Sequence, residues 1–383
     1  MRLKSLALVA GITFSLTARG APAPTGSAPP ASTPPDPEIL VLPGVFSTPE
    51  TGFGGGAGLF ILDHPIDSDQ GSKANALRIG AIYTEKKQFI LRGSLERYVN
   101  DNRDLITLSV MAQRYPDSFF GVGNNTRVRD EEKYTSYAWE TSARYLHEVN
   151  PRVYIGAQAA IYHERIDHLK PGGFLNRRTD QNDNPVRGID PFALSGAGIL
   201  FRRDTRDDYQ DPVRGSFVEA STTTRLRALG SDHQYNTTAV DTRWFVPLSP
   251  AKPPASGNVP RLAFQALAIS INGDPPFQAL AMMGGRDVLR GYFLGRYRDR
   301  DLAVFQSELR IPVSQRWGAV AYAGAGNVSR HWSGMKLREF KPATGAGVRY
   351  RLSDVQKVNI RLDLTWGRET PNPSFYLSLA EAF

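Results

Sequence analysis

Apolar and polar residues alternate one by one over unusually long segments of this sequence. In the segment that ends at Trp366, one set of side chains is Val358, Ile360, Leu362, Leu364 and Trp366, and the other is Asn359, Arg361, Asp363 and Thr365. Two more runs meet at Pro151: Tyr137, Trp139, Thr141, Ala143 and Tyr145 share a face before it, and Val153, Ile155, Ala157, Ala159 and Ile161 share one after it. Because successive side chains of a strand point to opposite sides, the pattern predicts β-strands with one apolar and one polar face.

Two architectures fit such strands. A soluble antiparallel sheet turns its polar face to water, and a transmembrane barrel turns its apolar face to lipid and its polar face to the lumen. Charged residues on the polar face, such as Glu140, Arg144 and Asp363, exclude a buried sandwich core. The segments have about ten to thirteen residues, which exceeds the usual length of soluble strands and matches the roughly 9 to 11 residues needed to cross a bilayer at a tilt. The strand length therefore favours the barrel.

The predicted fold class is an all-β, 16-stranded antiparallel transmembrane β-barrel. We place the sixteen strands near residues 39–47, 53–63, 74–84, 87–98, 103–114, 134–148, 152–166, 192–204, 215–227, 234–246, 260–273, 301–312, 317–328, 342–352, 355–367 and 374–383. An even number of strands puts both chain ends in the periplasm, as in bacterial single-chain barrels. Residues 115–133, 167–190 and 273–300 are then expected to be outer loops.

The beginning of the chain is typical of an exported protein. Arg2 and Lys4 precede an apolar run from Leu6 to Leu16, and small residues follow at Ala18 and Gly20. We expect residues 1–20 to be a signal peptide; a single membrane anchor is the alternative, but the run is short for a span of roughly 20 residues. Residues 21–37 are rich in Pro and Ala and are expected to form a linker, which leaves residues 38–383 for the barrel.

The composition limits the partners. The chain has no cysteine, so disulfides cannot stabilise it. Its 46 Lys and Arg residues outnumber its 38 Asp and Glu residues, but the basic residues are scattered and no nucleic-acid motif accompanies them, so no nucleic-acid partner is expected. No later segment reaches the length of an apolar transmembrane helix.

The sequence ends in "FYLSLAEAF", an alternating apolar stretch. In a strand that continues to the last residue, Phe375, Leu377, Leu379 and Phe383 share one side, and only Glu381 interrupts it. An edge strand of a soluble sheet is the alternative. In a closed barrel this final strand pairs with the first, because an unpaired edge in hydrocarbon would leave backbone groups unsatisfied.

The stretch "GGRDVLRGYFLGRYRDRDLAVFQSELRIPV", Gly284 to Val313, resembles the long-loop motif of the BamA and TamA superfamily, the bacterial surface antigen barrels. Other stretches are similar to the same family: "FRRDTRDDYQDPVRGSF" to its turn between two strands, and "GAGVRY", "RLDLTWG" and "FYLSLAEAF" to its closing strands. "FFGVGNN" and "STPETGFGGG" resemble members that consist of the barrel alone. The resemblance implies a barrel-only member without POTRA domains, because the linker has no room for one.

The resemblance also implies a site. The long loop is expected to fold into the lumen, with Gly284, Gly285, Leu289, Arg290, Gly291 and Tyr292 as its motif. Arg290 matches the arginine that meets acidic groups on the inner wall, and Glu308 matches one of them. A solvated loop arginine is the alternative. The chain has Gly324 where the family usually has an aspartate, so the loop is expected to be held more weakly or to recruit Asp363 instead. The three glycines are expected to allow positive backbone torsions or close approach.

No catalytic, metal or cofactor site is predicted. The "DTRDD" run from Asp204 could suggest a metal site, but the turn formers that follow favour a charged periplasmic turn. The six histidines, at 64, 147, 163, 168, 233 and 331, lack metal-ligand spacing, and no serine lies in a nucleophile-elbow setting. An outer-membrane lipase remains an alternative because such sites assemble in space.

The resemblance implies a function in inserting or transporting polypeptide or lipid at the Gram-negative outer membrane, through a weak seam between the first and last strands. The glycines from Gly52 to Gly58 are expected to weaken the early strands. The alternative is a passive structural barrel or a small-solute channel. Expected partners are outer-membrane lipid, the barrel-assembly machinery that reads the last strand and so depends on Phe383, and a periplasmic partner protein.

Overall fold

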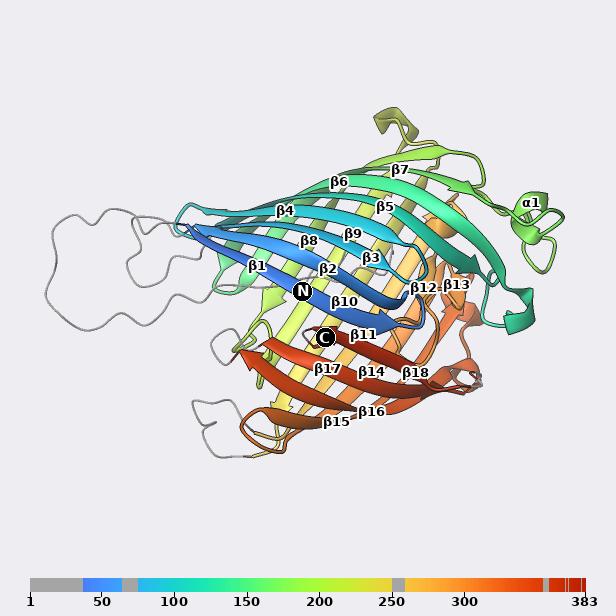
Figure 1. The fold of residues 1–383 in the computed structure, drawn as a ribbon. Coiled ribbons are helices and arrows are strands. Elements are labelled where there is room, and N and C mark those ends of the chain that lie inside the picture. The colour runs from blue at the N-terminus through green and yellow to red at the C-terminus, as the bar shows by residue number, and fades with distance from the viewer. Residues whose placement is uncertain are drawn as a thin grey trace, which may run out of the picture.

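The chain forms a closed β-barrel (Figure 1). The structure, a computed structural model, describes residues 37–63, 75–249, 259–353, 358–368, 370, 372–379 and 381–383. The predicted signal peptide, the predicted linker up to residue 36, and His64 lie outside the described residues.

Sixteen antiparallel strands make up the wall, as the alternation predicts. They are β1 (Glu38–Thr48), β2 (Gly52–Asp63), β3 (Asn75–Thr84), β4 (Phe89–Val99), β5 (Asp104–Phe119), β6 (Glu132–Asn150), β7 (Val153–Asp167), β8 (Phe192–Asp204), β9 (Gly215–Arg225), β10 (Tyr235–Pro247), β11 (Arg261–Gly273), β14 (Asp301–Pro312), β15 (Trp317–Ser329), β16 (Lys341–Ser353), β17 (Val358–Gly367) and β18 (Ser374–Leu379). Each strand pairs with its neighbours in the chain, and β11 pairs with β14.

Short elements lie in the connections. They are β12 (Ala281–Met283) and β13 (Tyr297–Asp299), which pair with each other, the helix α1 (Phe174–Arg177), and the 3-10 turns η1 (Val128–Asp130), η2 (Arg227–Leu229), η3 (Phe277–Ala279), η4 (Trp332–Gly334) and η5 (Leu337–Glu339). Across the described ranges, no helix has the length and apolar character that a membrane crossing needs.

The two faces of the strands differ as the sequence predicts. In β17, Leu362, Leu364 and Trp366 are 40–44% exposed on the outside, whereas the intervening Arg361 and Asp363 are almost fully buried in the lumen. This arrangement inverts that of a soluble sheet, because the apolar side faces outward and the charged side faces inward. It is the pattern of a barrel wall in lipid.

The strands β5 and β6 are longer than predicted. The sequence predicts an outer loop from Tyr115, but β5 continues to Phe119 and pairs with β6 as far as Glu132. Pro116 lies within this extension, although proline lacks a ladder donor. It is nevertheless accommodated opposite Thr135. We call the end of the barrel reached by these strands, where α1 and the β12–β13 hairpin also lie (Figure 1), the long-loop end.

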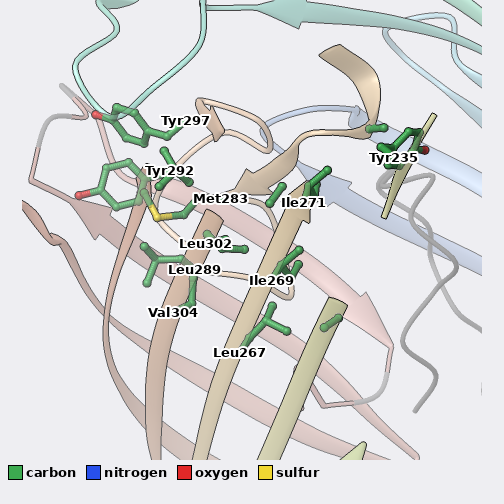
Figure 2. Close-up of a cluster of buried hydrophobic side chains, with 14 of the residues drawn as sticks. Tyr235, Leu267, Ile269, Ile271, Met283, Leu289, Tyr292, Tyr297, Leu302 and Val304 are labelled. Atoms are coloured by element: carbon green, nitrogen blue, oxygen red, sulfur yellow. The ribbon is translucent and has the colours of Figure 1, made fainter. Parts of the chain in front are cut away.

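The connection from Asp274 to Arg300, which we call the lumen loop, fills this end of the barrel. Its apolar side chains Met283, Leu289, Tyr292 and Tyr297 are fully buried and belong to one cluster with inward-facing residues of the wall. Figure 2 shows Leu289 and Met283 beside Leu302 and Val304 of β14, with Ile269 of β11 close by. Burial of apolar surface therefore holds the loop inside the barrel.

The last strand is shorter than predicted. The alternation predicts Phe383 on the same side as Phe375, but β18 ends at Leu379 and Phe383 is 3% exposed inside the lumen. Here it packs with Phe245, Ala263 and Ala382. The chain end turns inward because of Glu381, which accepts a hydrogen bond from Nε of Arg349 at 2.9 Å. A carboxylate is far more stable beside an inner-wall guanidinium than on a lipid-facing strand.

Candidate functional site

The lumen loop turns sharply at the glycines of its motif. Gly284, Gly285 and Gly291 have φ values of +112°, +80° and +107°, torsions that only glycine adopts readily. A Cβ at Gly284 would lie 2.1 Å from the carbonyl oxygen of Phe293, and one at Gly291 2.9 Å from the backbone of Trp366 and Gly367. Leu289 has φ +128°, so the turn before Arg290 is strained.

These turns place Arg290 against two carboxylates of the inner wall. Its Nη1 donates to Oδ2 of Asp363 on β17 at 2.6 Å, and its Nη2 donates to Oε1 of Glu308 on β14. The guanidinium also lies over the ring of Tyr322 on β15, 4.1 Å from its centroid. Arg290, Glu308 and Asp363 are at most 2% exposed. One loop residue thus joins three strands.

Other arginines share these carboxylates. Arg310 donates from Nε to Glu308 at 2.8 Å, and Arg349 donates from Nη1 to Asp363 at 2.6 Å. The network is buried, so each charge depends on its partners: removing one partner of a buried pair leaves an uncompensated charge.

Gly324 explains why Asp363 takes part. Gly324 faces the lumen on β15, and a Cβ there would lie 2.9 Å from Cδ1 of Leu289 and 3.0 Å from the carbonyl oxygen of Phe305. The side chain of Leu289 occupies the space that a family aspartate would need. The second carboxylate therefore comes from β17 through Asp363, which was one of the two outcomes expected from the sequence.

The remaining motif residues reach the closing strands. The hydroxyl of Tyr292 donates to the carbonyl of Pro342 on β16 at 2.7 Å and accepts from the backbone N–H of Arg368 at 3.0 Å. The N–H of Gly291 donates to the hydroxyl of Tyr376 on β18 at 3.3 Å. Tyr376 was not predicted as a site residue, although alternation places it on the polar side of the last strand.

The same part of the loop also touches the first hairpin. The N–H of Leu294 donates to Oε1 of Glu50, in the turn between β1 and β2, at 2.7 Å. Glu50 is 2% exposed, and this burial raises the pKa of its carboxyl above the ordinary range. The segment Gly291–Leu294 therefore spans the seam, with Tyr376 on one side and Glu50 on the other. Glu50 belongs to the "STPETGFGGG" stretch, but it was not predicted as a site residue.

The seam itself is short. Among the described residues, β1 and β18 pair at one position, Ser47 with Leu377. The same strand β1 pairs with β2 along its whole length, from Glu38–Leu62 to Thr48–Gly52. In that ladder Gly54 makes room for the ring of Phe46, which lies 2.3 Å from where a Cβ would be. The weakening by the glycines from Gly52 to Gly58 stays a prediction. The weak junction lies at β18.

The inward turn of the chain after β18 explains the short seam. Besides Arg349, Glu381 binds Nδ2 of Asn359 at 2.8 Å, and the carbonyl oxygen of Phe383 accepts from Nη2 of Arg310 at 3.0 Å. These residues bind the lumen wall instead of extending the ladder along β1. Within the described residues, the part of β1 before Ser47 has no partner in β18.

The charged turn between β8 and β9 also folds inward, at the opposite end. Asp211 is 2% exposed and forms ion pairs with Arg261 on β11 and, at 2.5 Å, with Arg351 on β16. Asp207 and Asp208 accept hydrogen bonds from backbone N–H groups of their own turn, which suits the turn interpretation of the "DTRDD" run. In the part of the chain that the structure describes, no group of three or more His, Asp or Glu side chains could hold a metal ion.

Comparisons with known proteins agree with this architecture. A family model described as the Omp85 superfamily domain matches residues 72–383. The barrel of BamA from Haemophilus ducreyi lacking POTRA domains 1–3 superposes with a TM-score of 0.60 at 13% identity, covering 89% of this chain and 70% of that one. CdiB from Acinetobacter baumannii gives a TM-score of 0.56 at 10% identity, covering 89% and 59%, and CdiB from Escherichia coli gives 0.56 at 11%, covering 90% and 63%. The search of curated protein sequences gave no match. At these identities the structures show the fold alone.

Proposed function

The chain belongs to the Omp85 superfamily, and we propose that it helps to insert or transport polypeptide or lipid at the outer membrane by opening the seam between β1 and β18. Omp85 barrels are bacterial outer-membrane proteins of a family that assembles or translocates proteins, and they are generally not enzymes. We propose in addition that the client is a polypeptide or a lipid and that it passes through the seam.

The short seam is the observation that carries this proposal. Separating two fully paired strands in hydrocarbon would expose a long row of backbone groups, each costing several kcal/mol. Here β18 holds β1 near Ser47, and Glu381 and Phe383 already bind inside the lumen. The segment of β1 from Glu38 to Gly44 offers an edge to which an incoming strand could add, in the way that sheet edges bind extended peptides.

The lumen loop supplies the control of this seam. Because Gly291 contacts Tyr376 and Leu294 contacts Glu50, the loop ties the two sides of the seam together from the inside. The loop is anchored through Arg290, which forms ion pairs with Glu308 on β14 and Asp363 on β17, away from β1. Opening the seam then requires the Gly291–Leu294 segment to break its hydrogen bond with either Tyr376 or Glu50, while Arg290 keeps the loop in the lumen.

The alternative function, a passive barrel or small-solute channel, receives less support. The lumen loop packs against the inner wall at the long-loop end, and the turn around Asp211 binds across the opposite end. A resting channel for solutes would need both to move.

A reversible crosslink across the seam tests the proposal. The chain has no cysteine, so Ser47→Cys with Leu377→Cys creates a single disulfide at the paired position. We expect oxidation to abolish membrane-assembly or lipid-asymmetry function in cells and reduction to restore it, with the barrel folded throughout. The matched control is Val41→Cys with Leu59→Cys, which joins β1 to β2 within a continuous ladder and should leave function intact. Full function with the seam locked would refute lateral opening, and a change confined to solute flux would favour the channel.

A further inference from the structure

Two arginines flank a tyrosine on the outer surface of the barrel at the long-loop end. Arg114 of β5 is paired with Tyr137 of β6, and Tyr137 is paired with Arg165 of β7. Paired residues in an antiparallel ladder point to the same side of the sheet, so the three side chains form one row. Both guanidiniums lie near the tyrosine ring, at 6.0 Å for Arg114 and 4.3 Å for Arg165.

This row faces outward. Its neighbours in the same strands, Tyr115 and Ala138, are buried in the lumen, whereas Ala112 and Trp139 are exposed with the row. The side chain of Arg165 is 50% exposed. In the next row towards the membrane, Trp139 is stacked with His163, with an interplanar angle of 7° and centroids 6.1 Å apart.

The two guanidiniums keep donors for an external group. Nη1 of Arg114 donates to the carbonyl of Lys87 at 2.6 Å, and Nη1 of Arg165 donates to Asp167 at 2.7 Å. A guanidinium has five N–H donors arranged as a planar fork. These bonds and the contacts with Tyr137 fix the position of each fork and leave the greater part of it to bind an anion.

The position in the bilayer identifies that anion. A charged side chain on the lipid face of a barrel is strongly unfavourable at the midplane and nearly neutral at the interface, so this row belongs at the headgroup level. Below it, Leu91, Val110 and Trp139 are 43%, 54% and 47% exposed and offer an apolar surface to acyl chains. A ligand that meets both surfaces has a negative headgroup and hydrocarbon tails.

We propose that Arg114, Tyr137 and Arg165 form a binding site for a phosphate-bearing lipid of the outer leaflet, with both arginines on the headgroup phosphate. Arginine forks match phosphate oxygens in pairs, and Asp167 is the carboxylate that holds Arg165 in place beside them. The inference rests on the proposed outer-membrane orientation, with the long loops outside, and is independent of seam opening.

The test is binding of lipid A, which carries two phosphates, to the folded full-length protein in detergent, followed by native mass spectrometry. We expect Arg114→Gln with Arg165→Gln to weaken binding at least about tenfold and dephosphorylated lipid A to bind the native protein equally weakly. The control is Arg97→Gln with Arg203→Gln, two exposed, outward-facing arginines near the opposite end of the barrel, and it should bind as the native protein does.

Further measurements separate the outcomes. Arg114→Lys with Arg165→Lys keeps both charges but not the forks, and we expect its lipid A affinity to lie between those of the native protein and the glutamine variant. This lysine variant still tests the site if the double glutamine variant folds poorly. Equal affinity in native and glutamine variants, or an equal loss in the control pair, would overturn the site. Displacement of lipid A by millimolar inorganic phosphate would reassign it to free phosphate. Lipid A binding is also measured with the Ser47→Cys and Leu377→Cys crosslink formed, and we expect it to be unchanged. A loss of the lipid site would therefore leave the seam proposal untouched.

Discussion

Arg290 and Asp363 are 73 residues apart in the sequence, and their side chains meet inside the barrel, with Nη1 and Oδ2 2.6 Å apart. Asp363 lies on β17, two strands away from the β15 position where the family resemblance implies an aspartate. The loop therefore keeps two carboxylates around its arginine, because Glu308 supplies the other. Leu289 lies against Gly324 on β15, and the second carboxylate comes from β17.

Replacing Arg290 by Ala should release the lumen loop. Glu308 and Asp363 would lose a shared partner within a buried network, so we expect the free energy of unfolding to fall by about 3 kcal/mol or more. We also expect higher ion conductance in planar bilayers and faster proteolysis between Asp274 and Arg300. The control is Arg178→Ala, which removes an exposed loop ion pair with Asp190 and should leave stability nearly unchanged, because solvent screens such pairs. Unchanged conductance and proteolysis in the Arg290 variant would show that apolar packing alone holds the loop.

A side chain at position 324 should lower the stability of the barrel. Alanine there would force Leu289 or the strand backbone to shift, and we expect the free energy of unfolding to fall by about 1 to 2 kcal/mol. Gly318 faces the lumen on the same strand, but a Cβ there would meet its nearest atom at 3.4 Å. Gly318→Ala should therefore be neutral or slightly stabilising, because it also restricts the unfolded chain. Urea unfolding followed by gel mobility compares the two, and equal stability of the variants would contradict the packing argument.

Glu50 should make the seam contact dependent on pH. Burial raises the pKa of its carboxyl above its ordinary value near 4.5, so its contribution to stability is fully present below that value and is lost as pH rises through the raised pKa. We expect Glu50→Gln to remove this loss, so that the variant is more stable than the native protein at neutral pH and equal to it in acid. Thermal unfolding from about pH 4 to pH 8 measures the difference.

The control for Glu50 titrates in the other direction. Asp190 is paired with Arg178, which lowers the pKa of its carboxyl, so its contribution is present above the ordinary value and is lost only as pH falls through the lowered one. Asp190→Asn should therefore leave the pH dependence of stability across the neutral range unchanged, because the contribution that it removes is constant there. A native protein and a Glu50→Gln variant with parallel pH profiles would rule out Glu50 as the titrating group.

Phe383 should stabilise the barrel from inside. Its ring is buried with Phe245 and Ala263 and lies near Arg310, so Phe383→Ala should lower the free energy of unfolding by about 3 kcal/mol through the cavity it leaves. Phe375, at 40% exposure on the outer face, serves as the control, because its alanine variant leaves no internal cavity and should cost less than Phe383→Ala. Heat-modifiable mobility of the folded barrels provides the measurement. Equal losses would place Phe383 with the lipid-facing residues after all.

The sequence alone was enough for the wall of the barrel. Period-two alternation is a local property, and the membrane adds a single rule, apolar side outward, so sixteen strands and their inward and outward faces follow from the order of residues. The family motif was also sufficient to direct attention to Arg290 and Glu308, since both lie within one continuous stretch of the chain.

Only the tertiary structure decided how the ends of the chain and the loops meet. The contacts of Leu294 with Glu50, of Asp211 with Arg351, and of Phe383 with Arg310 join residues far apart in the sequence, and no local pattern encodes such pairs. The tail shows the reason most clearly. Alternation favours a strand through Phe383, but the buried guanidiniums of Arg349 and Arg310 offer Glu381 and Phe383 stronger partners than β1 does. The choice depends on charges brought together by barrel closure, and closure is a property of the whole fold.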